Sequence, residues 1–379
     1  MSITQVIQLL FLVPIILNPI FGDWRGQVST LGNIHKKSSG YDSHIGIQYV
    51  PTWSLVVPWP TALFDTEFSL NINSQFNLKN NNENPIDFNL ETYRLWLRRS
   101  TDVLDIRVGL QKITFGPARL LRSLRWFDHI DPTDPLQLTE GVWGIRAIRY
   151  FENNSNIWLW GLFGNSDTKG WEIIPTKKNN LEFGGRFQTQ IGNSEIGLSA
   201  HNRIVSRRDL PEFLEINTMA NATNEFRVAI DGYYDIGAGL WFEATYTHTD
   251  FGIDHPNWQA LFTVGSDYTL SIGNGLTIIA EHFMYNLADK PSHVNNDLHL
   301  SAFMAAYQVS ILDRFSTIFF YNWDSDLPYV YLSWHRTYDN WTFNLNSFYS
   351  SKNASQENYY RSITDFSSRG VQVMLIYHH

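Results

Sequence analysis

The sequence predicts an all-β protein, a single transmembrane antiparallel β-barrel of about eighteen strands, from three observations. Apolar and polar residues alternate with a period of two along most of the chain. Aromatic residues make up 15% of the 379 residues, while the mean hydropathy is only −0.24. Short and long connections alternate between the predicted strands. A barrel strand presents every second residue to lipid, collects aromatic side chains at the membrane interfaces, and joins its neighbours by turns that are short at one end.

The first 22 residues, MSITQVIQLLFLVPIILNPIFG, predict a cleaved signal peptide. Their apolar core covers residues 7–16 and ends at an Asn-Pro pair, although no Lys or Arg precedes Arg25. The alternative is a buried or membrane-anchoring N-terminal segment. No later apolar run is long enough for a membrane helix. Residues 23–379 are therefore predicted to form the barrel as one domain.

The clearest alternation lies in FSLNINSQFNL, where Phe68, Leu70 and Ile72 fall on one face and Ser69 and Asn71 on the other. Interpreting each alternating run as a strand gives eighteen strands, with sixteen as the alternative count. The predicted strands cover residues 24–32, 42–51, 64–78, 87–100, 102–112, 143–151, 155–164, 181–191, 195–205, 224–234, 237–249, 258–270, 274–287, 297–309, 312–323, 328–337, 340–351 and 370–378.

From Arg99 onward, short connections of two or three residues alternate strictly with longer ones, of which the longest has thirty residues (113–142). Tight periplasmic turns and long external loops produce this rhythm in a barrel. Residues 52–63 depart from it, as a long periplasmic connection or as lengthened strand. The last strand ends on His379 and not on the usual terminal aromatic, but its alternation still predicts recognition by the barrel-insertion machinery.

Composition and motifs exclude several functions. The net charge of −9 argues against a general nucleic-acid binder, and the absence of cysteine excludes disulfides and thiolate chemistry. The chain contains no HExxH, GxSxG, EF-hand or phosphate-binding motif. Glu243 and Glu281 are interpreted as acids of the barrel lumen and not as a glycosidase pair. We therefore predict no enzyme, no cofactor and no metal, with an envelope enzyme on a barrel scaffold as a minor alternative.

Basic residues concentrate in one part of the predicted lumen. Residues 94–149 hold ten Lys or Arg against six Asp or Glu, in a chain of net charge −9. If the polar face of each strand is the interior of the barrel, these side chains face a water-filled pore. Their positive charge would then favour the passage of anions. The predicted selectivity residues are Arg94, Arg98, Arg107, Arg119, Arg122, Arg125 and Arg146. Their predicted counter-charges are Asp128, Asp131, Asp134 and Glu140. Alternatively, the arginines pair with these acids and only hold a loop in place.

The longest connection, residues 113–142, is unusually apolar for a loop. Leu120, Leu124 and Trp126 predict that it folds inward against the barrel and narrows the pore. The alternative is a lid on the outer rim. Arg119, Arg122 and Arg125 recur every three residues, so a short helical turn would bring them to one side.

The same region resembles the alginate-export-type porins and related outer-membrane barrels. The resemblance lies in VGLQKITFGPARLLRSLRWFD and GVWGIRAIRYF. Its matching positions are Gly109, Gln111, Gly116, Arg119, Leu120, Trp126, Gly141 and Arg146. Leu110 replaces the family's arginine, and DPTDP lengthens the segment after Trp126. The resemblance covers about 40 residues and implies a single-chain barrel whose arginine-rich lumen passes acidic sugars or polymers.

The sequence therefore predicts a porin-like channel of the bacterial outer membrane for passive diffusion of small hydrophilic, anionic or sugar-like solutes. The alternative is a barrel for exopolysaccharide or capsule export or surface assembly. The expected partners are outer-membrane lipid, small solutes or acidic polysaccharide, and the barrel-insertion machinery. No nucleic acid is expected, and the sequence does not mark a subunit interface.

Overall fold

A computed structural model describes residues 22–37, 40–78, 86–206, 222–251, 256–290, 296–350 and 369–379. The predicted signal peptide and most of the predicted connections 206–223 and 352–369 lie outside these residues. No helix in the described part of the chain is long and apolar enough to cross a membrane.

Alternating side chains and β-branched or aromatic residues form eighteen strands. The strands are β1 (Asp23–Lys37), β2 (Gly40–Trp59), β3 (Ala62–Asn77), β4 (Ile86–Ser100), β5 (Leu104–Gln111), β6 (Val142–Tyr150), β7 (Asn156–Leu162), β8 (Glu182–Ile191), β9 (Ser194–Ser206), β10 (Ala222–Asp235), β11 (Gly239–Thr249), β12 (Trp258–Leu270), β13 (Leu276–Ala288), β14 (Asn296–Gln308), β15 (Asp313–Asn322), β16 (Leu327–Tyr338), β17 (Trp341–Ser350) and β18 (Arg369–His378).

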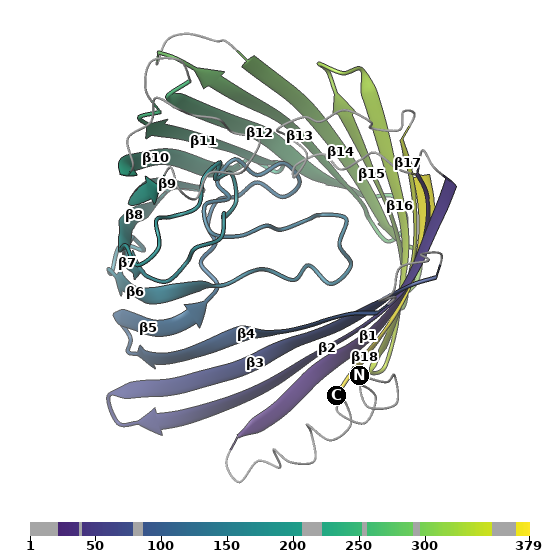
Figure 1. Ribbon diagram of the computed structural model, residues 1–379, viewed down its shortest axis with the longest axis horizontal. Helices are drawn as coiled ribbons and strands as arrows, with labels where there is room; N and C mark the ends of the chain where they lie inside the picture. The colour runs from purple at the N-terminus through teal and green to yellow at the C-terminus, as the bar shows by residue number, and fades with distance from the viewer. Residues whose placement is uncertain are drawn as a thin grey trace.

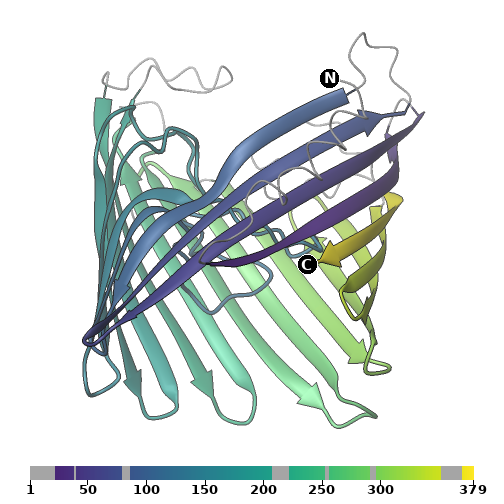
Figure 2. The ribbon, with the colours of Figure 1, turned by 90° about the horizontal axis from the view of Figure 1, so that it is seen from below.

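The strands form one closed antiparallel barrel (Figure 1). Each strand pairs with its neighbours in the chain, and β1 also pairs with β18, with Gln27 opposite His378 and Lys36 opposite Arg369. Figure 2 shows β1 and β18 side by side where the barrel closes. Closure satisfies the backbone of the first and last strands and leaves no sheet edge. The predicted all-β barrel is confirmed, with eighteen strands and not sixteen.

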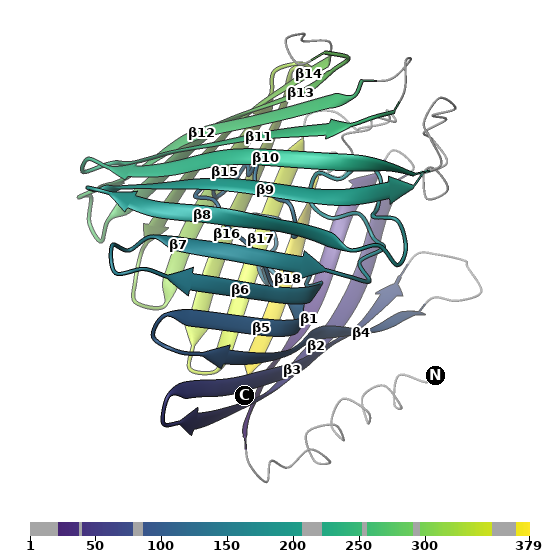
Figure 3. The same ribbon diagram turned by 90° about the vertical axis from the view of Figure 1, so that its left-hand side faces the viewer.

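The short turns gather at one end of the barrel, as Figure 3 shows for the β2–β3, β4–β5 and β6–β7 connections. Residues 52–63 are lengthened strand: β2 and β3 continue to a turn at Pro60 and Thr61. Of the two predicted explanations for this segment, the long periplasmic connection was therefore wrong.

The outer wall is apolar and exposed. Leu97, Leu159 and Leu198 expose 56%, 60% and 51% of their surface, whereas the next residue of β9, Ser199, faces inward and exposes 6%. A water-soluble protein rarely shows such a continuous apolar band. Because closed barrels satisfy every backbone polar group internally, this wall is suited to lipid.

The inner wall carries polar side chains on most strands and an apolar patch among them on one side of the barrel. On β11 to β15, the inward residues Trp241, Phe283, Leu300 and Phe320 are almost completely buried. The expectation that the polar parity of every strand marks the interior was wrong on β14, where Leu298, Leu300 and Ala302 form the inward face. Two connections fold into the lumen and pack on the apolar patch, so its side chains are buried against protein and not against water (Figure 1).

Candidate functional site

The first connection inside the barrel, residues 112–141 between β5 and β6, is called the first inner loop. Its Gly116 has a φ of +95°, which suits glycine, and lies against the inner wall, where a Cβ at this position would overlap the Glu243 carboxylate of β11. The prediction that the long connection folds inward is thus confirmed, and the lid on the outer rim is excluded.

Two wall carboxylates hold the first inner loop by its backbone. Glu281 of β13 accepts the N–H groups of Arg119, Leu120 and Leu121 at 2.7, 2.9 and 2.5 Å. Its Oε1 also accepts the Trp241 indole N–H at 3.0 Å. These charge-assisted bonds stabilise a buried carboxylate without a basic side chain.

Glu243 of β11 acts in the same way on two further residues. Its oxygens accept the N–H groups of Ala118 at 3.0 Å and Leu124 at 2.7 Å. We call Glu243 and Glu281 together the carboxylate latch. The interpretation of both as lumen acids was correct, but their binding to the loop was missed, because the contacts join residues more than one hundred positions apart.

Further contacts carry the first inner loop across the lumen. Thr263 of β12 donates its hydroxyl to the Leu121 carbonyl at 2.6 Å, and its oxygen lies 2.7 Å from that of Ser123. Tyr331 of β16 donates to the Thr133 carbonyl at 2.8 Å. The loop therefore spans from β5 to strands on the other side of the barrel.

Apolar side chains anchor the same loop, as the sequence predicted. Leu120 and Leu121 pack with the apolar wall of β11 to β16, while Leu124, Trp126 and Phe127 join a second cluster. In that cluster Phe115 stacks on Trp160 with ring centroids 5.8 Å apart.

A second inner loop, residues 163–181 between β7 and β8, was predicted only as an external connection. Its Trp171 stacks on Phe283 at 5.0 Å and donates its indole N–H to the Arg122 carbonyl at 2.9 Å. Lys177 donates its backbone N–H to the Ile204 carbonyl at 2.8 Å. The apolar residues Trp171, Ile173 and Ile174 were the available signal in the sequence.

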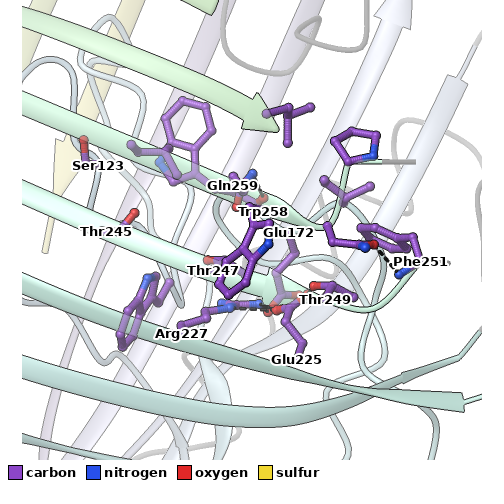
Figure 4. Close-up of a pocket in the computed structure, with 17 residues that line it drawn as sticks. Ser123, Glu172, Glu225, Arg227, Thr245, Thr247, Thr249, Phe251, Trp258 and Gln259 are labelled. Carbon is purple, nitrogen blue, oxygen red and sulfur yellow. Dashed lines mark hydrogen bonds and ion pairs between the residues drawn. The ribbon is translucent and has the colours of Figure 1, made fainter. Parts of the chain in front are cut away.

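The second inner loop is joined to β8, β9 and β10 by a buried ionic network. Its cations are Lys169, Arg203 and Arg227, and its anions are Glu172, Glu182 and Glu225. Six ion pairs link them: Lys169–Glu172 (3.4 Å), Lys169–Glu182 (3.3 Å), Arg203–Glu172 (3.1 Å), Arg203–Glu225 (2.6 Å), Arg227–Glu172 (2.9 Å) and Arg227–Glu225 (2.5 Å). Figure 4 shows the Arg227 end of this network. The formal charges balance, as buried ion networks require.

Three predicted arginines, Arg98, Arg107 and Arg146, lie together on the inner face of β4 to β6. Arg98 binds Asp65 through two nitrogens at 2.7–3.1 Å and reaches Asp105 at 3.3 Å. Arg146 lies 3.6 Å from Asp105. Among the described residues Arg107 has no carboxylate within 4.0 Å, and it stacks on Trp96 at 4.2 Å. Three cations thus share two acids.

Arg94 is buried against the first inner loop. A bulge between Ser69 and Leu70 in the β3–β4 pairing leaves Tyr93 unpaired and precedes the inward Arg94. Arg94 exposes 6% of its surface, stacks on Tyr93, and donates to the Thr139 carbonyl and hydroxyl at 2.7 and 2.8 Å.

The three arginines of the first inner loop point to different partners. Arg119 pairs with Asp267 of β12 at 2.7 Å, and buried Arg122 pairs with Asp128 at 3.1 Å. Arg125 donates to His129 Nδ1 at 3.0 Å, and burial lowers the pKa of its guanidinium. The predicted helical turn was wrong. In a helix the Leu124 N–H would donate to the Leu120 carbonyl, whereas here it donates to Glu243.

Of the four predicted counter-charges, Asp128 alone forms an ion pair with an arginine among the described residues. Asp131 and Asp134 accept N–H groups two residues ahead, from Thr133 and Leu136, and so shape local turns. Burial raises the pKa of the Asp134 carboxyl, an effect opposed by its backbone hydrogen bonds. Glu140 lies 4.0 Å from His129.

No group of three or more potential metal ligands occurs in the described ranges. The arrangement is a barrel lumen crossed by two inner loops, in which Arg107 and Arg125 have no carboxylate within 4.0 Å among the described residues.

No family model and no curated protein sequence matches this chain. Solved structures do. The chain is similar to an anion-selective porin from Comamonas acidovorans, with 12% identity, 94% of this chain and 99% of that chain covered, and a TM-score of 0.50. It is similar to OccAB1 of Acinetobacter baumannii, with 9% identity, 94% and 96% covered, and a TM-score of 0.57.

A third similar structure is Wzi of Escherichia coli, an outer membrane protein involved in group 1 capsule assembly and a carbohydrate-binding β-barrel. The two chains are 11% identical, the alignment covers 100% of this chain and 89% of the Wzi chain, and the TM-score is 0.53. At these identities the comparisons show the fold, which is that of the outer-membrane barrels of the porin type. The resemblance to alginate-export-type porins stays a prediction.

Proposed function

We propose that the protein is a channel of the bacterial outer membrane, through which small hydrophilic solutes diffuse passively with a preference for anions or sugar-like molecules. The observation that carries the proposal is the first inner loop, which crosses a closed lipid-facing barrel and narrows its lumen. The anion preference rests on Arg107 and Arg125, which have no carboxylate within 4.0 Å among the described residues. The anion-selective porin of the same fold agrees with this assignment.

Electrostatics also favour this direction. The carboxylate latch is buried beneath the first inner loop, where N–H donors surround its oxygens. In contrast, the group of Arg98, Arg107 and Arg146 holds one more cation than anion. An uncompensated charge inside a low-dielectric wall concentrates counter-ions in a pore.

The purified protein in a planar lipid bilayer under a KCl gradient tests this proposal. We expect ion conduction, with a reversal potential closer to the equilibrium potential of chloride than to that of potassium. Arg107→Gln should lower the anion-to-cation permeability ratio roughly fivefold, since a unit charge ~8 Å from an ion in water contributes about 0.5 kcal/mol of opposite sign for the two ions. Arg149→Gln removes an exposed cation from the outward parity of β6 and serves as the control. Absence of conduction, or a firm cation preference, would refute the proposal.

A role in surface polysaccharide export or assembly is the second candidate, favoured by the similarity to the carbohydrate-binding barrel Wzi over the whole chain. Deletion of the gene separates the two. Loss of exopolysaccharide or capsule with normal uptake of small solutes favours assembly, and the reverse result favours the channel. No reaction is assigned to the barrel.

A further inference from the structure

A cavity of about 230 Å³ lies in the lumen between the two inner loops and the wall. We call it the lumen pocket. It is lined by Arg125, His129 and Asp131 of the first inner loop, Trp171 of the second, and Phe320 and Tyr329 of the wall. Pockets for drug-sized ligands have volumes of roughly 300–1,000 Å³, so this smaller pocket is suited to one small ring-bearing solute.

The first charged group of the pocket is the Arg125 guanidinium. Arg125 donates to His129 Nδ1 at 3.0 Å, and Nε2 of the same ring lies 3.3 Å from the Thr168 carbonyl oxygen. Arg125 Nε is buried without a hydrogen-bond partner, and no carboxylate of the described residues lies within 4.0 Å of this arginine. Nε is closed to solvent, but Nη1 and the second N–H of Nη2 donate to no other described residue, and together they can bind a planar carboxylate through two hydrogen bonds.

The second charged group of the pocket is Asp131. Its Oδ1 accepts the backbone N–H of Thr133 at 2.8 Å and the Thr133 hydroxyl at 2.7 Å. Within the described part of the chain no basic side chain lies within 4.0 Å of it. Its other oxygen can accept a charged donor, so the pocket offers separate sites for a negative and a positive group.

The remaining lining is aromatic. Phe320 and Tyr329 lie on neighbouring strands with ring centroids 6.1 Å apart, and the Trp171 ring is stacked on Phe283. Aromatic walls bind rings through offset and edge contacts, with a gain beyond the apolar area that they bury.

We propose that the lumen pocket binds a free α-amino acid with an aromatic side chain. Its carboxylate binds Arg125, its ammonium group binds Asp131, and its ring packs against Phe320 and Tyr329. A simple carboxylate would leave Asp131 as an unmatched negative neighbour, and a simple amine would leave Arg125 unmatched. The inference rests on the proposed channel only in so far as the solute reaches the pocket through it.

Calorimetric titration of the full-length barrel in detergent tests the pocket, with three probes that differ by one group. We expect saturable binding of L-phenylalanine. 3-Phenylpropionate lacks the ammonium group and 2-phenylethylamine lacks the carboxylate. Each should bind at least about tenfold more weakly than L-phenylalanine, as the loss of a charged hydrogen bond implies.

Arg125→Gln and Asp131→Asn should each weaken phenylalanine binding about tenfold or more. Arg119→Gln removes a loop cation that already pairs with Asp267 outside the pocket, and its binding should equal that of the wild type. Retention of the folded barrel is checked for every variant by its heat-dependent gel mobility.

The outcomes separate the pocket from the channel. No saturable phenylalanine binding, or equal binding of phenylpropionate, overturns the pocket even where bilayers show conduction. Phenylalanine binding without conduction supports the pocket and refutes the channel. Binding that all three variants retain places the ligand elsewhere and overturns the assignment of Arg125 and Asp131.

Discussion

Replacing Glu281 by Gln is expected to release the first inner loop and raise the single-channel conductance. Glu281 Oε1 accepts the Arg119 N–H and the Trp241 indole N–H, and Oε2 accepts the Leu120 and Leu121 N–H groups. Whichever oxygen becomes the amide nitrogen, two donors lose their acceptor and face another donor. We expect the docking of the loop to weaken by about 2–4 kcal/mol.

The same argument ranks the two members of the carboxylate latch. Each oxygen of Glu243 accepts one backbone N–H, so Glu243→Gln orphans a single donor and should have a smaller effect. The double variant should have the largest conductance. Glu91→Gln is the matched control, because Glu91 is an exposed residue of β4 that hydrogen-bonds to Asn89 and does not contact the loop.

A second measurement reports on the loop directly. The chain has no cysteine, so Ser123→Cys introduces a single thiol at a loop position that is completely buried. A water-soluble maleimide should label this thiol slowly in the otherwise unchanged barrel and much faster with Glu281→Gln. If conductance and labelling match the Glu91→Gln control even in the double latch variant, apolar packing alone holds the loop and the latch has no role.

Periodicity was sufficient to predict the wall of the barrel. The parity of each strand placed Arg98, Arg107 and Arg146 on the inner face, and the apolar residues Leu120, Leu124 and Trp126 predicted that their loop folds inward. These are local signals, because side-chain direction in a strand depends only on neighbouring residues.

The partners of those side chains could not be predicted in the same way. Arg98 binds Asp65, its direct partner on the neighbouring strand β3, and Glu281 binds a loop about 160 residues away in the chain. Such pairs depend on the strand register and on the path of the loop across the lumen. The second inner loop was missed for a related reason: Trp171 looks like an exposed loop aromatic until its partners Phe283 and Arg122 are placed.

Glu225→Gln is expected to destabilise the barrel strongly, because it breaks the charge balance of the buried ionic network. Glu225 accepts hydrogen bonds from Arg203 and Arg227, and the side chain of Arg203 is completely buried. Without this carboxylate, two arginines share Glu172, and one positive charge is left unmatched. Removing one member of a buried ion pair typically costs about 3–5 kcal/mol.

Urea unfolding in lipid vesicles, followed by tryptophan fluorescence, measures this loss. Arg336→Met breaks the partly exposed Arg336–Asp313 pair at 3.4 Å and should cost at most about 1 kcal/mol. Adding Arg227→Met to Glu225→Gln removes the unmatched cation, so the double variant should be more stable than the sum of the two single losses implies. If Glu225→Gln costs no more than Arg336→Met, or if the two losses simply add, then charge balance is not what fixes the second inner loop to β9 and β10.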